Sequence, residues 1–465
     1  MPAPALATAE DTVAFLTAFN RLNRERYPFL LCSSASRDDN TQFDILPACP
    51  QYTFSLSADK TLNFCEVDDI GRQAPPAGFF ELLERRFQQE KIPATDSELP
   101  FTGGWFVYLA YEMAEEIEPR LQLPALNPSQ PLAWAARCPA AIIYDKQNRR
   151  LLAVAESEHA ALLDVLAQDF SQLLQQPGLY TKESATISLA SLQESDTGPY
   201  RQQVQRIKQY IIDGDIFQAN LSRLWTAELQ QDYDDASLFR ALARNNPSSF
   251  AAMACLPGMS IISSSPERLV SLRNNTVETR PIAGTRPRNS RQADDQALAD
   301  ELLAHPKEQA EHIMLIDLER NDLGRVCQPG SIEVNELMVL ETWEHVHHIV
   351  SNVRGRLQAD RSPVDVLRAV FPGGTITGCP KVRCMEILAE MEQQPRGAYT
   401  GSLGYINRDG SMDFNILIRS LVRQGRDLSF RAGGGIVSDS IADNELAETR
   451  AKARGLLKMF SLEGA

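Results

Sequence analysis

The sequence has 465 residues, 43% of them hydrophobic and 23% charged, which is enough apolar content for a large folded core. Acidic residues outnumber basic residues by 61 to 46, and the net charge of −15 disfavours binding to nucleic acid. Residues 1–20 lack the basic start of a secretory signal, and no apolar run is long enough to cross a bilayer. The eight cysteines form no C-x-x-C pair and no zinc spacing, so we expect reduced thiols, a cytoplasmic location and no membrane partner.

The first part of the chain, residues 1–175, mixes helical and strand-like patterns. Apolar residues at helical spacing predict helices at 11–24, 77–89 and 159–174. Period-two and continuous apolar patterns predict strands within 29–64, at 105–113, and in a hairpin made by AAIIYD and RRLLAVAES. Residues 176–199 are rich in Gln, Ser, Thr and Gly, so we interpret them as a linker to a second region, 200–465.

The second region continues the mixed pattern. Helices are predicted at 200–213, 292–304, 307–318, 382–391 and 444–459. Strands are predicted at 216–229, 249–256, 259–265, 268–273, 276–284, 401–406, 413–422 and 428–437. Strand runs that mix with separate helices, without regular β-α-β alternation, favour an α+β fold. Several of these strands are apolar throughout, so we expect both of their faces to be covered.

Two predicted helices each carry a pair of glutamates three residues apart, Glu308 with Glu311 and Glu445 with Glu448. Residues at this spacing share a helix face, so each pair directs two carboxylates to one place. Two such helices side by side would make an oxygen-rich site for Mg²⁺. Spacing alone favours the simpler reading, in which these faces are solvated and the glutamates pair with neighbouring lysines and arginines.

Three glycine-containing segments, PIAGT at 281–285, PGGTITGCPK at 372–381 and AGGG at 432–435, allow close approach of the backbone to a ligand. Together they would suit the carboxylates of a small diacid, whereas each segment alone is more simply a turn. The second segment lacks the spacing of a Walker A loop. His347 and His348 point in opposite directions if their segment is a strand, so one of them faces a site or is a satisfied buried histidine.

Three further charged residues are candidates for chemistry. Glu267 follows an apolar strand and three serines. A carboxyl group in such a place can have a shifted pKa and act as an acid or base, but the simpler interpretation is an ion pair with Arg268. Arg419 ends the apolar run NILIR and would bind a carboxylate if it is buried, or lie at an exposed strand end. Lys452, one helical turn after Glu448, either neutralises the carboxylates, binds a second substrate carboxylate, or is a surface lysine.

The ordered set of motifs in the second region resembles the chorismate-utilising enzymes, which include anthranilate, aminodeoxychorismate, isochorismate and salicylate synthases. The motifs are PIAGTRPR, AEHIMLIDLERNDLGR, HHIVS, FPGGTITGCPKVRCMEI, GSLGYI, MDFNILIRSL, AGGGIVSDS and ELAETRAKA. The resemblance covers about residues 200 to 460 strongly and the first region more loosely. It implies an α+β fold of four layers, in which two antiparallel sheets face each other and helices pack outside.

The resemblance also implies roles for residues at matching positions. Glu311 and Glu448 are expected to bind Mg²⁺, which bridges to the ring carboxylate of chorismate, and Glu308 and Glu445 are expected to reach it through water. Glu267 is expected to protonate the departing C4 hydroxyl, with His348 near that group and the ring. The expected substrate contacts are Gly284, Thr285, Thr375, Tyr405, Arg419, Gly433, Gly434, Gly435 and Lys452.

The nucleophile is expected to be ammonia from a separate glutamine amidotransferase subunit. Isochorismate and salicylate synthases have a water-activating lysine where this sequence has Gln218, and an amide is a poor base. The product is expected to be 4-amino-4-deoxychorismate, because the tryptophan-sensing Leu-Leu-Glu-Ser of anthranilate synthases is LLCSS here. Ala283 departs from this prediction, since many aminodeoxychorismate synthases have a lysine there that attacks C2, and it keeps anthranilate synthesis as the alternative. A non-catalytic chorismate-binding subunit is a third reading, which the four glutamates disfavour.

Overall fold

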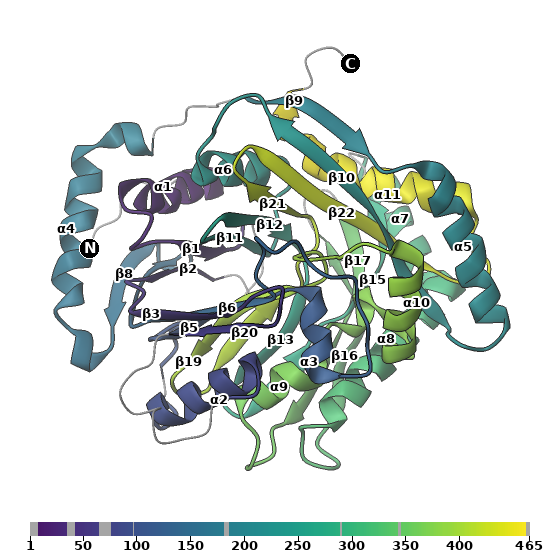
Figure 1. Ribbon diagram of the computed structural model, residues 1–465, viewed down its shortest axis with the longest axis horizontal. Helices are drawn as coiled ribbons and strands as arrows, with labels where there is room; N and C mark the ends of the chain where they lie inside the picture. Colours follow the sequence, from purple (N-terminus) through teal and green to yellow (C-terminus); the bar gives the residue numbers. More distant parts are fainter. Residues whose placement is uncertain are drawn as a thin grey trace.

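The computed structural model describes residues 8–34, 42–64, 76–95, 97–180, 186–288, 291–342 and 346–461. Within these ranges the chain forms two large sheets, and every strand pair is antiparallel except that of β9 with β23 (Figure 1). The first, 12-stranded sheet has the order β23 (Phe460–Ser461), β9 (Ile187–Glu194), β10 (Gln218–Leu229), β22 (Asp427–Ile436), β21 (Ser420–Gln424), β12 (Met259–Ser265), β11 (Phe250–Leu256), β1 (Phe29–Cys32), β2 (Phe43–Ala48), β7 (Ala140–Asp145) and β8 (Arg150–Ala155), with β18 (Gly378–Cys379) beside β10.

The second sheet also combines strands from both halves of the sequence. Its 11 described strands have the order β15 (Ile282–Pro287), β17 (Val346–Arg356), β14 (Thr276–Thr279), β13 (Arg268–Arg273), β20 (Met412–Asn415), β19 (Ser402–Asn407), β5 (Gly104–Leu109), β6 (Ala133–Cys138), β3 (Tyr52–Leu56) and β4 (Leu62–Phe64), with β16 (Glu333–Thr342) beside β17. Strand β9 lies within the segment 176–199 that we interpreted as a linker, and it pairs with β10 inside the first sheet.

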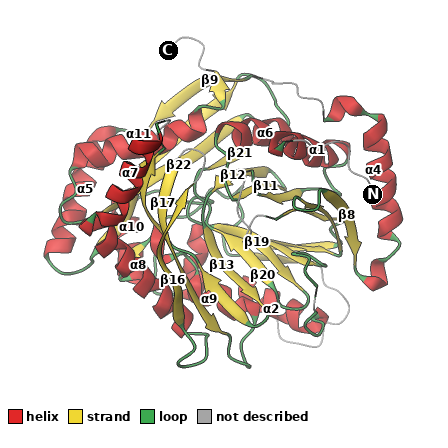
Figure 2. Cartoon of the chain, turned by 180° about the vertical axis from the view of Figure 1, so that it is seen from behind, coloured by secondary structure: helices red, strands yellow, loops and turns green. Residues whose placement is uncertain are grey.

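Helices cover the outer faces of both sheets, which Figure 2 shows from behind. The helices against the first sheet are α1 (Ala9–Leu22), α4 (Leu162–Gln175), α5 (Thr197–Ile212), α6 (Asp235–Asn245), α10 (Lys381–Glu392) and α11 (Ala442–Leu457). The helices against the second sheet are α2 (Phe79–Glu90), α3 (Ala114–Ile117), α7 (Gln292–Ala304), α8 (Pro306–Gly324) and α9 (Pro363–Val370). Short 3-10 turns are η3 (Tyr111–Met113), η4 (Ser157–His159), η5 (Pro177–Leu179) and η6 (Gly374–Ile376). The predicted α+β class with four layers is therefore confirmed.

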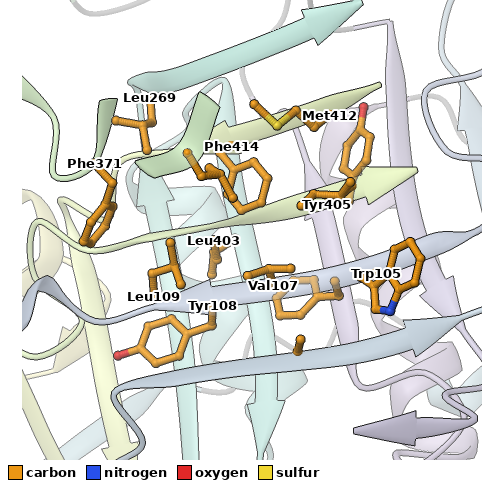
Figure 3. Close-up of a cluster of buried hydrophobic side chains, with 14 of the residues drawn as sticks. Trp105, Val107, Tyr108, Leu109, Leu269, Phe371, Leu403, Tyr405, Met412 and Phe414 are labelled. Atoms are coloured by element: carbon orange, nitrogen blue, oxygen red, sulfur yellow. The ribbon is translucent and has the colours of Figure 1, made fainter. Parts of the chain in front are cut away.

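The two sheets pack face to face through a continuous apolar core. Phe29 of the first sheet stacks on Phe106 of the second with ring centroids 3.8 Å apart. Strands β5, β7, β12 and β19 are buried along their whole length, which the mostly apolar sequences of β5 and β7 predict. Figure 3 shows part of this core, where Trp105 and Val107 on β5 lie near Tyr405 and Phe414 on β19 and β20. Among the described helices, none combines the length and hydropathy that a membrane span needs.

One predicted strand, residues 413–422, is instead two. Strand β20 belongs to the second sheet and β21 to the first, and the chain crosses between the sheets at residues 416–419. Arg419 has a left-handed backbone (φ 50°), which ends the extended run. The apolar pattern cannot reveal this crossing, because Ile416, Leu417 and Ile418 lie within it and continue the apolar run of the strand. The crossing matters for function because it places Arg419 between the two sheets.

Candidate active site

Segments that are distant in the sequence meet where the edges of the two sheets approach each other. Strands β10 and β22 pair in register there, with Asn220 opposite Gly435. In the other sheet β15 pairs with β17, with Thr285 opposite His348. Helix α11 packs on β22, and helix α8 packs on β15 and β17 (Figure 1). The two helices that carry the glutamate pairs are thereby brought to the same region.

A hydrogen bond connects helix α8 to the first sheet. Nε2 of Gln218, at the start of β10, donates to Oε1 of Glu311 over 2.9 Å. A methyl group on Gly435 would lie 2.0 Å from the same nitrogen, so only glycine leaves room for this contact. The other amide atom, Oε1 of Gln218, is buried and has no hydrogen-bond partner among the described residues. Gln218 therefore holds Glu311 beside β22 and presents an unused acceptor to the site.

Helix α11 directs its two glutamates at the neighbouring glycine. A methyl group on Gly434 would lie 3.4 Å from Oε1 of Glu448 and 3.5 Å from Oε2 of Glu445. Lys452 pairs with Glu448 over 2.7 Å and donates to the carbonyl of Gly433 over 2.8 Å. Glu448 thus lies beside Gly434 directly, whereas Glu311 is connected to the neighbouring Gly435 only through Gln218.

The other glutamate of the pair on helix α8, Glu308, lies against strand β15. Its Oε2 would be 2.9 Å from a methyl group on Gly284, whose positive φ of 65° also favours glycine. Arg286 approaches Oε1 of Glu308 at 3.4 Å. His348 Nδ1 donates to the Gly284 carbonyl over 3.3 Å, since a carbonyl can only accept. Burial lowers the pKa of His348 to about 4, so the imidazole is neutral near pH 7 and serves as a hydrogen-bond partner rather than an acid.

Glu267 is the buried acid of the site, with 6% of its surface exposed. Thr375 Oγ1 donates to its Oε1 over 2.7 Å. Burial raises the pKa of Glu267 to about 7, against the opposing effects of Thr375, Arg419 and Lys452. The simpler reading, an ion pair with Arg268, is wrong, because Arg268 makes a two-pronged pair with Asp413. Glu267 is therefore held near the midpoint of its titration at neutral pH.

The structure places one predicted substrate contact elsewhere. Tyr405 is 8% exposed, packs edge-on against Phe101 and lies near Arg268 and Asp413, in the core between the sheets. Tyr399, six residues earlier, was not among the predicted contacts but lies beside the glycine segment, with its hydroxyl 2.7 Å from the methyl position of Gly433. Asn220 is a second residue that the sequence reasoning missed, since its Oδ1 also faces Gly433 and is buried without a partner.

Two expected positions on β15 have different outcomes. Ala283 is 7% exposed and packs with Leu315 and Leu318 of α8, so an apolar contact occupies the position of the family lysine. The backbone of Thr285 pairs with that of His348, and the side chain of Thr285 lies outside the described residues.

The donor set fits a magnesium ion that is completed by a bound ligand. Carboxylates are the oxygen donors that Mg²⁺ prefers, and the glycine backbone leaves space between them. In the described parts of the chain, no three His, Cys, Asp or Glu side chains are grouped closely enough to hold an ion by themselves. Glu311 and Glu448 are the residues that would hold Mg²⁺, with the remaining ligands supplied by a substrate carboxylate and water.

A large cavity lies apart from these carboxylates. It measures about 1060 Å³ and is lined by Leu31, Cys32 and Ser33 of β1 and its end, together with Phe250 and Tyr405. Neither Glu267 nor any of the four paired glutamates contributes to its lining. We place the chemistry at the carboxylates rather than in this cavity, because the titratable groups with opposed charges converge there.

Comparison with known proteins identifies relatives along most of the chain. The chorismate binding enzyme family profile matches residues 34–458. Aminodeoxychorismate synthase component 1 of Bacillus subtilis is 40% identical over 455 residues, which cover 97% of this chain and 95% of that protein. The anthranilate synthase component I-like protein of Synechocystis sp. is 42% identical over 367 residues, 79% of this chain and 74% of that protein. The crystal structure of anthranilate synthase component I from Streptococcus pneumoniae has a TM-score of 0.77 and 30% identity, covering 90% of this chain and 93% of that one.

Proposed function

The chain belongs to the family of chorismate binding enzymes, and from that premise we propose that it aminates chorismate to 4-amino-4-deoxychorismate with ammonia from a glutamine amidotransferase subunit. The observation that carries the proposal is the buried acid Glu267, which lies near Lys452, the lysine that pairs with Glu448. The product would serve the synthesis of 4-aminobenzoate and folate.

The residues have separate tasks in this reaction. The C4 hydroxyl of chorismate is a poor leaving group, so it must leave with a proton, which Glu267 supplies in its acid form. Mg²⁺ held by Glu311 and Glu448 would bind the ring carboxylate and draw electron density through the conjugated diene. Arg419 and Lys452 are the cations near Glu267, and they are suited to the substrate's carboxylates.

Gln218 supports ammonia as the nucleophile. Its buried Oε1 accepts no hydrogen bond within the protein, and an ammonia molecule there would donate one. An amide cannot remove a proton from water at neutral pH, so the site lacks the base at this position that hydration would need. Ala283 supplies no nucleophile at C2, and amination at C4 then proceeds by direct displacement or through another group at C2.

The position of amination is supported by two features. The near full-length similarity to the Bacillus subtilis aminodeoxychorismate synthase component favours C4, and so does the absence of glutamate from the LLCSS segment. The alternative, attack at C2 with loss of pyruvate to give anthranilate, is favoured by Ala283 and by the similarity to the Streptococcus anthranilate synthase structure.

A product assay tests the proposal directly. The purified protein is incubated with chorismate, ammonium and Mg²⁺, with and without added 4-amino-4-deoxychorismate lyase. We expect 4-aminobenzoate to form only when the lyase is present. Fluorescent anthranilate in the absence of lyase would instead establish the alternative, and binding of chorismate without turnover would indicate a non-catalytic subunit.

Tryptophan is expected to leave the initial rate unchanged at millimolar concentration. Cys32 occupies the place of the glutamate in the tryptophan-sensing segment, and burial holds its pKa well above the usual range, so the thiol stays neutral. A neutral thiol cannot pair with the ammonium group of an amino acid, whereas a carboxylate can. Rates measured over a tryptophan titration check this, and the variant Cys32→Glu tests whether a carboxylate restores inhibition. Inhibition of the unmodified protein would contradict the prediction.

A further inference from the structure

Helix α8 carries a third buried carboxyl group that the mechanism above does not use. Glu319 lies about three helical turns after Glu308, on the same side of the helix, and is only 6% exposed. Its Oε1 lies 3.7 Å from the methyl position of Gly374. The next residue, Thr375, is the one that donates to Glu267. Glu319 is therefore packed against the turn that presents Thr375 to the buried acid.

The other neighbours of Glu319 lead toward the protein surface. Asp322, one turn further along α8, is 4% exposed and pairs with Lys381 at the start of α10. Asp322 and Lys381 line a pocket of about 280 Å³. Arg120 and Arg325, with 66% and 50% of their side chains exposed, line the same pocket, so it opens to solvent. A row of titratable groups thus runs from solvent through Asp322 and Glu319 to Glu267.

The proposed reaction needs such a row because it consumes a proton at Glu267. The C–O bond at the ring breaks, the hydroxyl takes the proton of Glu267 and leaves as water, and ammonia forms the new C–N bond as a substituted ammonium ion. Glu267 remains as a carboxylate and has to regain one proton before the next turnover. Since Glu267 is 6% exposed, bulk water reaches it poorly while substrate is bound.

We propose that Glu319 returns this proton to Glu267, drawing on solvent through Asp322 and the pocket beside Lys381. The O–H bond of Glu319 breaks as the O–H bond of Glu267 forms, and Glu319 is then protonated by a solvent acid. This inference rests on the proposed amination only in needing Glu267 to act as an acid. It makes Glu319 a residue that acts through Glu267 and does not touch the substrate.

The charges around Glu319 suit this role. Burial and the neighbouring Asp322 raise the pKa of Glu319 to about 8, while Lys381 and the Thr279 hydroxyl lower it. Glu267, with a pKa of about 7, is the fourth neighbour, and its negative charge is one of the causes of this raised pKa. Two carboxyl groups of similar acidity exchange a proton at little free-energy cost. Glu319 is therefore mostly protonated at neutral pH and has a proton to return once Glu267 has lost its own.

The test compares the first turnover of Glu319→Gln with its later turnovers, in rapid-quench experiments that follow the loss of chorismate. We expect the first turnover to have the wild-type rate and amplitude, because Glu267 starts in the same protonation state in both proteins, and the steady-state rate to fall at least about tenfold. Imidazole buffer at pH 7, which enters the pocket, should restore the steady state, whereas a bulky sulfonate buffer of similar pKa should not. Asp317→Asn is the control, since Asp317 lies on the same helix but is 64% exposed.

Two results would overturn the role of Glu319. The first is a steady-state rate equal to that of the unmodified protein, and the second is an equal loss of first and later turnovers without rescue by imidazole. If Glu319→Gln does not fold, as judged by its thermal midpoint, Asp322→Asn is tested by the same criteria. Product formation by the unmodified protein establishes the proposed function within the same experiment, so a normal rate in the variant overturns the proton supply alone.

Discussion

Replacing Glu311 with glutamine is expected to reduce chorismate turnover at least about a thousandfold, which corresponds to roughly 4 kcal/mol of activation free energy. The substitution keeps the size of the side chain but removes one of the two charges that would hold Mg²⁺ against the ring carboxylate. Glu448→Gln is expected to have the same effect from helix α11. The two losses should not add, because either one removes the ion from the same site.

These variants should fold normally, since neither glutamate lies in the apolar core. Calorimetry of chorismate binding with and without Mg²⁺ separates a lost metal site from a lost fold. Binding by the unmodified protein should depend on Mg²⁺, and binding by Glu311→Gln should not. Asp443→Asn, a change on the first turn of α11 at a side chain that is 73% exposed, is the matched control. Normal turnover in either glutamine variant would show that the metal is held elsewhere or is not needed.

The paired glutamates were accessible to sequence reasoning because their spacing has a local physical meaning. Residues three apart share a helix face whatever the tertiary structure, and both helices formed where the pattern placed them. Spacing could not show that the two helices lie on different sheets or that Gln218 would connect Glu311 to β10. The contact of Gln218 with Glu311 joins residues 93 positions apart, and only the ordered family motifs suggested that such distant segments meet.

Tyrosines illustrate where sequence reasoning fails. Tyr399 lies two residues before the motif GSLGYI and Tyr405 lies within it, and both are buried aromatic residues that follow small residues. Tyr405 sits within strand β19, where alternation turns its ring into the core between the sheets. Tyr399 precedes the strand in a turn whose next residue, Thr400, has a φ of 61°, and this turn directs its hydroxyl toward Gly433. Choosing between them requires the turn geometry, which the sequence does not determine.

The sequence at the start of helix α9 contains a helix-capping signal that our predictions did not use. Ser362 and Asp365 form a capping box, with Pro363 at the first helical position. The pattern S-P-x-D is therefore sufficient to predict the start of this helix. Glu319 had no comparable signal, because a glutamate in a polar helix looks solvent-exposed until the packing of the turn at 374–375 over it is known.

Glu267→Gln is expected to lower the turnover number by about a hundred- to ten-thousandfold, the range that a lost general acid usually produces. Glutamine fits the same space and still accepts the hydrogen bond from Thr375, but it has no proton to give to the C4 hydroxyl. In the unmodified protein the acid form of Glu267 falls away as pH rises through about 7, so turnover should decline over that interval. Rates of the unmodified protein from pH 6 to 9 that stay constant would contradict this assignment.

The same substitution should raise stability at high pH, which distinguishes it from a variant that is merely misfolded. The folded state raises the pKa of Glu267 from 4.5 to about 7, so it holds the proton more tightly than the unfolded chain does. The contribution of this proton to the free energy of unfolding is complete below pH 4.5 and is lost as pH rises through 7. The difference is up to about 3 kcal/mol. Glutamine does not titrate. Urea unfolding should therefore show Glu267→Gln gaining stability relative to the unmodified protein between pH 5 and pH 8, while its activity stays low at both.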